Sequence, residues 1–131
     1  MRVFCTAMNT DAITTAQRYY AWAGRDFAAD AHALACNPQG VLLYTPQLVV
    51  LMKPADSRQP QDWAQLAHSP QQADAWYVHL LVGQLSLAGQ LAHRVPAYRW
   101  VCFQRGRRNA RPHRLPWARI LSHNSKIINN K

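Results

Sequence analysis

Residues 76–104 read WYVHLLVGQLSLAGQLAHRVPAYRWVCFQ, and this stretch decides the fold. A β-rich run at 76–82 is followed by apolar residues at helical spacing over 85–95 and by a second β-rich run at 98–104. A strand, a helix and a second strand in this order favour a right-handed crossover between two parallel strands. The stretch therefore predicts a sheet that contains a parallel pair and carries a helix on one face.

Upstream patterns predict the rest of the sheet. A short strand is expected at 2–7, and apolar residues at steps of three and four predict two helices within 11–36, separated near Gly24. Two β-rich runs at 40–44 and 48–53 are separated by a Thr-Pro-Gln turn and predict an antiparallel hairpin. The second of these runs is apolar on both faces, so we expect it to be central in the sheet.

The remaining segments are less regular. Residues 54–75 are rich in proline and glutamine and predict a surface excursion with at most two helical turns, in which Trp63 is either exposed or anchors the loop. A last strand is expected at 113–121, interrupted by Pro116. The predicted fold class is α+β: one mixed, mostly antiparallel sheet of about five to seven strands with flanking helices. We expect the chain to form a single domain over 1–121, followed by a flexible polar tail at 122–131.

Charge is distributed very unevenly along the 131 residues. The first 75 residues contain five basic and six acidic side chains, whereas residues 76–131 contain ten basic and no acidic side chains. A hydrophobic content of 49% excludes intrinsic disorder, no apolar run is long enough to cross a membrane, and three cysteines cannot form a paired disulfide framework. The composition therefore predicts a cytoplasmic protein, of the host cell or of a virion, without a membrane partner and with an anionic partner for its C-terminal half.

The run at 105–114 contains five arginines in ten residues, with Trp100 and Phe103 before it and Trp117 after it. Guanidinium groups bind phosphate oxygens, and interleaved aromatic rings can stack on bases. The alternative is a solvated arginine-rich hairpin tip. The predicted anion-binding residues are Arg99, Arg105, Arg107, Arg108, Arg111 and Arg114.

Two other groups could carry chemistry. His32 and Cys36 stand four residues apart on a predicted helix, but two ligands do not form a structural zinc site, so we expect no metal and a buried Cys36. His79 lies within the strand at 76–82 and is the one candidate general base, the alternative being a hydrogen-bonded or surface histidine.

The predicted element order resembles that of the GNAT superfamily of acyltransferases. The segments WYVHLLVG at 76–83 and YRWVCFQR at 98–105 are also similar to small GNAT-like proteins of tailed phages and prophages. The resemblance implies a loop of the form Arg/Gln-x-x-Gly-x-Gly/Ala that binds the pyrophosphate of acetyl-CoA or another acyl-CoA, and places the pantetheine arm between the fourth and fifth strands. Gly83, Gln84 and Leu85 would occupy that loop here.

Two features of the sequence depart from this enzyme family. The loop has Gly83 but lacks the second glycine, and the chain contains no glutamate that could act as a base. The predicted function is therefore a non-enzymatic accessory protein of the phage or mobile-element type, whose basic face binds nucleic acid or an assembly surface of a phage or host protein, without a cofactor. The alternatives are a small acyl-CoA-dependent N-acyltransferase with a degenerate pyrophosphate loop and a structural subunit.

Overall fold

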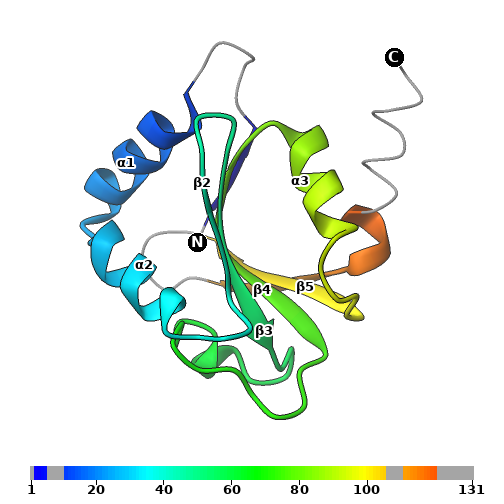
Figure 1. The fold of residues 1–131 in the computed structure, drawn as a ribbon. Coiled ribbons are helices and arrows are strands. Elements are labelled where there is room, and N and C mark those ends of the chain that lie inside the picture. Colours follow the sequence, from blue (N-terminus) through cyan, green and yellow to red (C-terminus); the bar gives the residue numbers. More distant parts are fainter. Residues whose placement is uncertain (1, 6–10, 106–110, 121–131) are drawn as a thin grey trace.

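A computed structural model describes residues 2–5, 11–105 and 111–120. They form one six-stranded mixed sheet with helices on both faces (Figure 1). The strands run β2-β3-β4-β5-β6, and β1 pairs separately with β4. The elements are β1 (Arg2–Cys5), α1 (Ala12–Ala23), α2 (Phe27–Ala35), β2 (Val41–Tyr44), β3 (Leu48–Ala55), a 3-10 turn (Pro60–Asp62), β4 (Ala75–Gly83), α3 (Leu85–Ala92), β5 (Trp100–Arg105) and β6 (Arg111–Pro116). This confirms the predicted fold class.

Helices α1 and α2 cover one face of the sheet, and α3 lies on the other (Figure 1). The side chain of Asp11 accepts a hydrogen bond from Ile13 N at 2.8 Å and caps α1, and Asp26 caps α2 in the same way. Gly24 ends α1 in the left-handed conformation, with φ of 66°. The predicted pair of helices within 11–36 is thus confirmed, with the boundary at the expected glycine. No described helix is long and apolar enough to cross a bilayer.

Strands β2 and β3 form the predicted antiparallel hairpin, and every residue of β3 is buried. The pairing of β3 with β4 shifts by one residue, because Leu51 pairs with Leu80 whereas Met52 pairs with Val78. His79 is the extra residue of this β-bulge. Since paired residues share a face of the sheet, Leu80 lies on the opposite face from Val78. The alternation of side chains between the two faces of β4 is therefore interrupted at His79.

The second edge of β4 is shared by two parallel strands. β5 pairs with Ala75–Tyr77 at the start of β4, and β1 pairs with Leu80–Gly83 at its end. The parallel pairing of β4 with β5 confirms the crossover predicted from residues 76–104. The parallel pairing of β1 has no counterpart among the sequence predictions.

The excursion between β3 and β4 is anchored to the body of the protein. Lys53 is 2% exposed, and its ammonium donates hydrogen bonds to the backbone carbonyls of Asp62, at 3.5 Å, Gln65, at 2.9 Å, and His68. Trp63 is also buried and donates from Nε1 to the carbonyl of Asp56 at 2.9 Å. The anchored role of Trp63 is therefore confirmed. The only described helical segment of the excursion is the 3-10 turn at Pro60–Asp62.

The chain after β5 differs from the prediction. β6 begins at Arg111 and ends at Pro116, and residues 117–120 are helical where the strand was expected to continue to 121. Proline removes a backbone donor and ends the ladder, and the buried Trp117 then packs against Trp76. The tail predicted at 122–131 lies outside the described residues, as do residues 106–110 of the arginine-rich run.

Candidate functional site

Two arginines share one tryptophan ring at the root of the β5–β6 hairpin. The guanidinium carbon of Arg99 lies 5.0 Å from the ring centroid of Trp100, and that of Arg114 lies 4.4 Å from it. Arg114 pairs with Cys102 across the ladder and so stands diagonally opposite Trp100 on the same face of the hairpin. Both guanidinium groups therefore lie within about 10 Å of each other. We call these three residues the Arg–Trp cluster.

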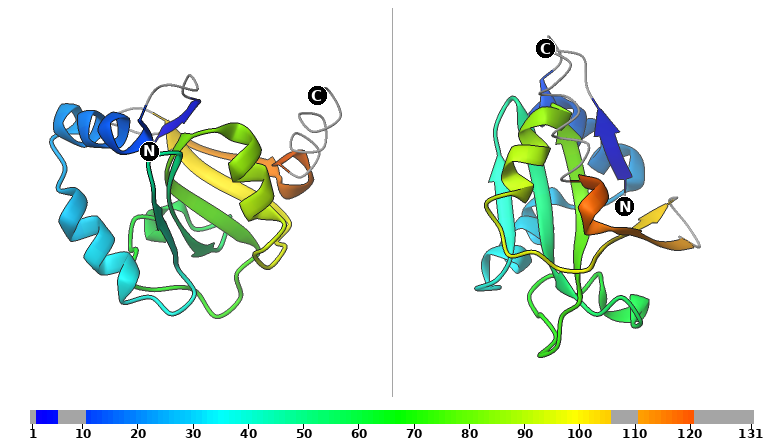
Figure 2. Two further views of the ribbon diagram at one scale, coloured as in Figure 1. Left: turned by 45° about the horizontal axis from the view of Figure 1, so that its top comes forward. Right: turned by 90° about the vertical axis from the view of Figure 1, so that its right-hand side faces the viewer.

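The hairpin continues beyond the sheet. Pairing of β4 with β5 ends at Tyr77 and Cys102, whereas β5 and β6 remain paired out to Arg105 and Arg111. In the right-hand view of Figure 2 this part of the hairpin points away from the rest of the protein. The exposed Arg111 and the ring of His113, which stacks on Phe103 with centroids 5.4 Å apart, lie on it.

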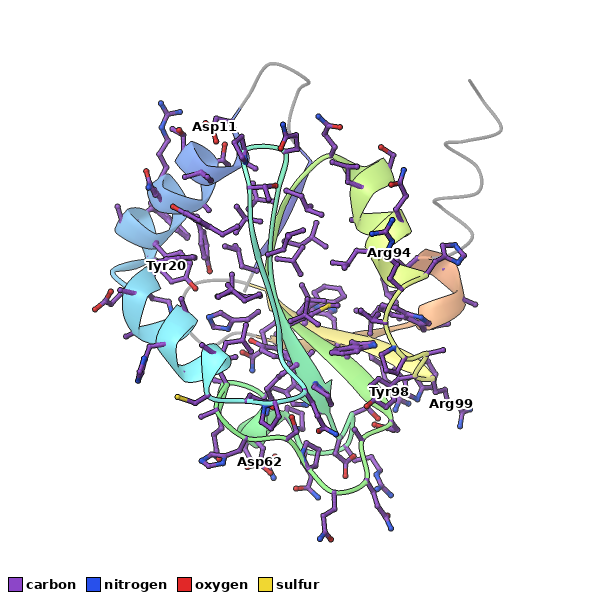
Figure 3. The ribbon with its side chains drawn as sticks, viewed as in Figure 1. Asp11, Tyr20, Asp62, Arg94, Tyr98 and Arg99 are labelled. Atoms are coloured by element: carbon purple, nitrogen blue, oxygen red, sulfur yellow. The ribbon has the colours of Figure 1, made fainter. Side chains whose placement is uncertain are left out.

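The structure thus brings Arg99 and Arg114 together and places Arg111 farther out on the same hairpin. Arg105 occupies the register position opposite Arg111. Arg107 and Arg108, the remaining predicted anion-binding residues, lie outside the described residues. Arg94 and Arg99 lie on the side of the molecule that carries α3, away from Asp11 and Tyr20 (Figure 3).

The carboxylates of the chain are engaged elsewhere. Ion pairs among the described residues join Arg25 to Asp30 and Arg58 to Asp56, and His79 is hydrogen-bonded to Asp30. Asp74 accepts hydrogen bonds from the backbone and hydroxyl of Ser57, both at 2.7 Å. Asp11 and Asp26 cap helices and Asp62 accepts from Gln65. Among the described side chains, those of Arg94, Arg99, Arg111, Arg114 and Arg119 have no carboxylate within ion-pair distance, so these cations carry uncompensated charge.

His79 belongs to a buried polar network that joins both helices of one face to the sheet. Its Nε2 lies 2.9 Å from Asp30 Oδ2 on α2, and its Nδ1 lies 3.3 Å from the hydroxyl of Tyr77. Tyr20 on α1 donates to the same Asp30 oxygen at 2.8 Å. A carboxylate can only accept, so Nε2 carries the proton and Nδ1 accepts from Tyr77. With both nitrogens engaged and 3% of the residue exposed, His79 presents no free nitrogen to a substrate.

The network sets the charge of its members. Burial lowers the pKa of His79, and the hydrogen bond to Asp30 only partly offsets this effect. Burial alone would raise the pKa of Asp30, but hydrogen bonds from His79 and Tyr20 and the nearby Arg25 hold it below its usual range. Burial also raises the pKa of Tyr20 and of Tyr77. At neutral pH the network therefore contains a carboxylate, a neutral imidazole and two neutral phenols.

This arrangement predicts a loss of stability on mild acidification. Because the pKa of His79 is lower in the folded than in the unfolded chain, the unfolded chain binds more protons below about pH 6.5. We expect the free energy of unfolding in urea to fall between about pH 7 and pH 5, by up to about 1.4 kcal/mol per pH unit from this group. The slope should shrink in His79→Gln and persist in the exposed-site control His93→Gln. Equal slopes in the two variants would contradict the assignment.

Gly83, Gln84 and Leu85 connect β4 to α3. Gly83 has φ of 138° and pairs with Leu48 of β3. The amide of Gln84 donates to the carbonyl of Gln47 at 3.1 Å, and the Gln84 side chain does not cap α3. Gly83 is thus required for the close approach of the β2–β3 turn, and the Gln84 amide already has an acceptor within the fold.

His32 and Cys36 do face each other on α2, with Nε2 and Sγ 4.0 Å apart. Cys36 is exposed, so the expectation that it packs in the core is wrong. The last turn of α2 buries only Leu34, and the cysteine follows on the solvent side. Within the described residues no group of three or more potential metal-ligating side chains comes together.

Two site features were not predicted from the sequence. Asp30, Tyr20 and Tyr77 join His79 across separations of up to 49 residues, which no local pattern reveals. The Arg–Trp cluster depends on the register of β5 and β6. Residues 100 and 102 lie on the same face of a strand, and Arg114 pairs with Cys102 across the hairpin. A correct guess of this register would therefore have placed Arg114 beside Trp100.

Comparisons with protein-family models, with curated proteins and with solved structures each found no match. The partner of this protein must therefore be inferred from its own residues.

Proposed function

We propose that this protein is a non-enzymatic, nucleic-acid-binding accessory protein whose Arg–Trp cluster contacts the phosphate backbone. The main support for this proposal is that the exposed guanidinium groups of Arg99 and Arg114 both contact the ring of Trp100. Neither group has a carboxylate partner among the described residues. A cationic pair of this kind is held in place by the ring and leaves its N–H groups available for phosphate oxygens.

Charge beyond the cluster supports the same partner. The half of the sequence from residue 76 to 131 contains ten bases and no acid. Arg94, Arg111 and Arg119 are exposed, and none of them is compensated by a described carboxylate. A polyanion with a regular row of phosphates would neutralise several of these charges at once, and the release of its counterions would drive binding.

The acyltransferase alternative is supported less well by the geometry. The GNAT resemblance places a pantetheine arm between β4 and β5, but β1 is paired with Leu80–Gly83 along that edge of β4. His79, the candidate base, has both ring nitrogens engaged. A rise in melting temperature with millimolar acetyl-CoA would nevertheless favour the enzyme, because a ligand that binds the native state must stabilise it.

Binding to a fluorescent oligonucleotide, measured by anisotropy over a salt series, tests the proposal. We expect affinity to fall steeply with salt, and each removed phosphate contact to reduce the slope of log K against log salt by about 0.9. Arg99→Ala combined with Arg114→Ala should weaken binding at fixed salt by about tenfold or more on every sequence tested.

The matched control is Arg18→Ala on α1, which removes an exposed arginine on the side of the helices. It should change the affinity by less than about threefold. The proposal fails if neither DNA nor RNA binds at low salt, or if Arg18→Ala and Arg114→Ala have equal effects.

A further inference from the structure

Strand β2 forms one edge of the sheet, and its outer side is open. The strand order places β3 on one side of β2 and, within the described residues, no strand on the other. In the right-hand view of Figure 2, β2 and the β5–β6 hairpin lie at opposite sides of the molecule. An open edge presents unpaired backbone N–H and C=O groups that another strand can use.

The hydrogen bonds of the β2–β3 turn show which backbone groups point outward. Thr45 and Leu48 exchange two backbone hydrogen bonds, at 3.0 and 3.3 Å, and therefore form a hydrogen-bonded pair of the ladder. Such pairs alternate with pairs whose backbone groups point away from the neighbouring strand, so Tyr44 and Leu42 turn their N–H and C=O groups to the open edge. Among the described residues, none of these four backbone groups has a hydrogen-bond partner.

β2 lacks the features that protect a sheet edge from pairing. It has the sequence VLLY, without proline or a charged residue, and residues 31–52 contain no Asp, Glu, Lys or Arg. The edge at β6 instead carries exposed arginines, and its Pro112 and Pro116 cannot donate to an added strand. Leu42 and Tyr44 are each 42% exposed. Both the backbone and the side chains of β2 therefore favour burial against another strand.

We infer that two copies of this protein pair through β2 and form a two-fold symmetric antiparallel dimer. Leu42 of one copy lies opposite Tyr44 of the second, and Leu43 lies opposite Leu43 at the two-fold axis. Each pair of Leu42 with Tyr44 exchanges two backbone hydrogen bonds, so the dimer gains four and uses every outward group of both strands. The exposed Leu42 and Tyr44 side chains also cover each other, because directly opposite residues share a face of the sheet.

The ends of the paired segment fit this register. Symmetry about Leu43 brings Gly40 opposite Pro46 of the second copy, at the next pair that would need backbone donors. The Gly40 amide already donates to the carbonyl of Asn37 at 3.0 Å. Pro46 has no N–H, and its carbonyl accepts from the amide of Ala12 at 2.8 Å. Pairing therefore stops at the same pair on both sides, and each copy presents a segment that is symmetric about Leu43.

The distribution of charge permits a second copy at this edge. The net charge of +9 opposes self-association in general, but the Arg–Trp cluster lies on the hairpin at the far edge of the sheet. The two clusters stand at opposite ends of the dimer, much farther apart than the about 8 Å over which charges act at physiological salt. Because β6 is protected, the pairing closes at two copies. Four residues per copy are far fewer than the roughly 20–30 of a stable interface, so the dimer is weak and reversible.

Sedimentation equilibrium of the full chain between about 10 and about 500 µM, without nucleic acid, tests the dimer. We expect a monomer–dimer equilibrium with a dissociation constant on the order of 100 µM. Leu42→Pro removes one outward N–H from each copy, and thus two of the four hydrogen bonds, without changing the bonds between β2 and β3. It should weaken dimerisation about tenfold or more.

A charged variant and its control keep the test decisive if the proline variant does not fold. Leu42→Lys keeps the backbone donor but places a charge on the edge, and should also weaken dimerisation about tenfold. Gln61→Lys adds the same charge at an exposed site of the excursion and should change the dissociation constant less than about twofold. Far-UV circular dichroism checks that each variant is folded.

Engineered cysteines test the register, in a chain whose Cys5 and Cys36 are replaced by serine. Leu43→Cys should give a cross-linked dimer under mild oxidation, because the two Cβ atoms at the axis are about 4.5–5.5 Å apart. Val41→Cys, on the same face of β2 and also half-buried, is the matched control. Its two copies stand four residues apart along the strands, about 13 Å, so it should cross-link at least about tenfold less.

The outcomes separate the dimer from the other possible occupants of the edge. A monomer at every concentration overturns the inference and leaves the edge to a strand of another protein. A dimer that is insensitive to both Leu42 substitutions, equal cross-linking at positions 41 and 43, or assemblies larger than a dimer also overturn it. Because these measurements contain no nucleic acid, their failure leaves the proposed function intact, and a failure of nucleic-acid binding leaves the dimer intact.

Discussion

Gly83→Ala is expected to destabilise the protein by about 3–5 kcal/mol. A Cβ at this position would lie 2.3 Å from the carbonyl oxygen of Gln47 and 2.8 Å from Leu48 Cα. Both are backbone atoms of the neighbouring hairpin and cannot rotate away. The φ of 138° adds strain, because residues with a side chain rarely adopt it.

Urea denaturation followed by circular dichroism measures this effect. The control is Gly24→Ala, which also replaces a glycine with positive φ, at the exposed C-cap of α1, and should cost only about 1 kcal/mol. If Gly83 serves mainly as a pyrophosphate-binding glycine, its replacement should alter ligand binding and leave stability nearly unchanged. A loss below about 1 kcal/mol would contradict the packing role described above.

Asp30→Ala should destabilise the protein by about 3–5 kcal/mol. The carboxylate accepts hydrogen bonds from His79 and Tyr20 and faces Arg25. Its removal leaves the His79 Nε2–H and the Tyr20 hydroxyl without an acceptor in the interior, at about 1–3 kcal/mol for each donor. It also removes the polar link between α2 and the sheet, which leaves the apolar packing of Leu34, Phe27 and Ala33 to hold the helix.

Two further variants make this prediction specific. Asp30→Asn retains one acceptor oxygen, so its cost should be smaller, about 1–2 kcal/mol. Asp11→Ala removes a helix cap instead and should cost about 1 kcal/mol. Calorimetric melting of the three proteins at one pH provides the comparison. Equal losses in Asp30→Ala and Asp11→Ala would show that the network contributes no more than a surface cap.

Local signals in the sequence predicted the elements with local causes. Asp11, Gly24 and Asp26 set the ends of α1 and α2 because capping acts within a few residues. The crossover from β4 to β5 followed from the spacing of two apolar runs around an amphipathic helix. These features depend on the order of neighbouring residues, and the order alone predicts them.

Features created by pairing were missed. The bulge at His79 arises from the register of β4 against β3, and it reverses the face on which Leu80 lies. The parallel pairing of β1 joins residues nearly 80 positions apart in the chain. Nothing in the segment around either strand encodes such a contact, because it depends on which edges remain unpaired after the rest of the sheet has formed.

The candidate site was predicted only in part, because its residues are brought together by strand pairing and helix packing. The density of arginine after residue 98 indicated the candidate anion-binding region, since charge is a property of composition. That Arg99 and Arg114 meet on Trp100 depends on hairpin register, and that His79 meets Asp30 depends on how α2 docks on the sheet. Composition therefore located the surface, whereas tertiary structure selected the residues within it.

The reactivity of Lys53 can report whether the loop between β3 and β4 is closed. Its amine is enclosed by three carbonyls of the loop that it anchors, and burial lowers its pKa. An amine-acylating reagent can reach this nitrogen only when the loop opens, although the lowered pKa would otherwise make the amine a good nucleophile. The degree of acylation at this single lysine consequently counts the molecules whose loop has opened, in a mixture where most of the protein is intact.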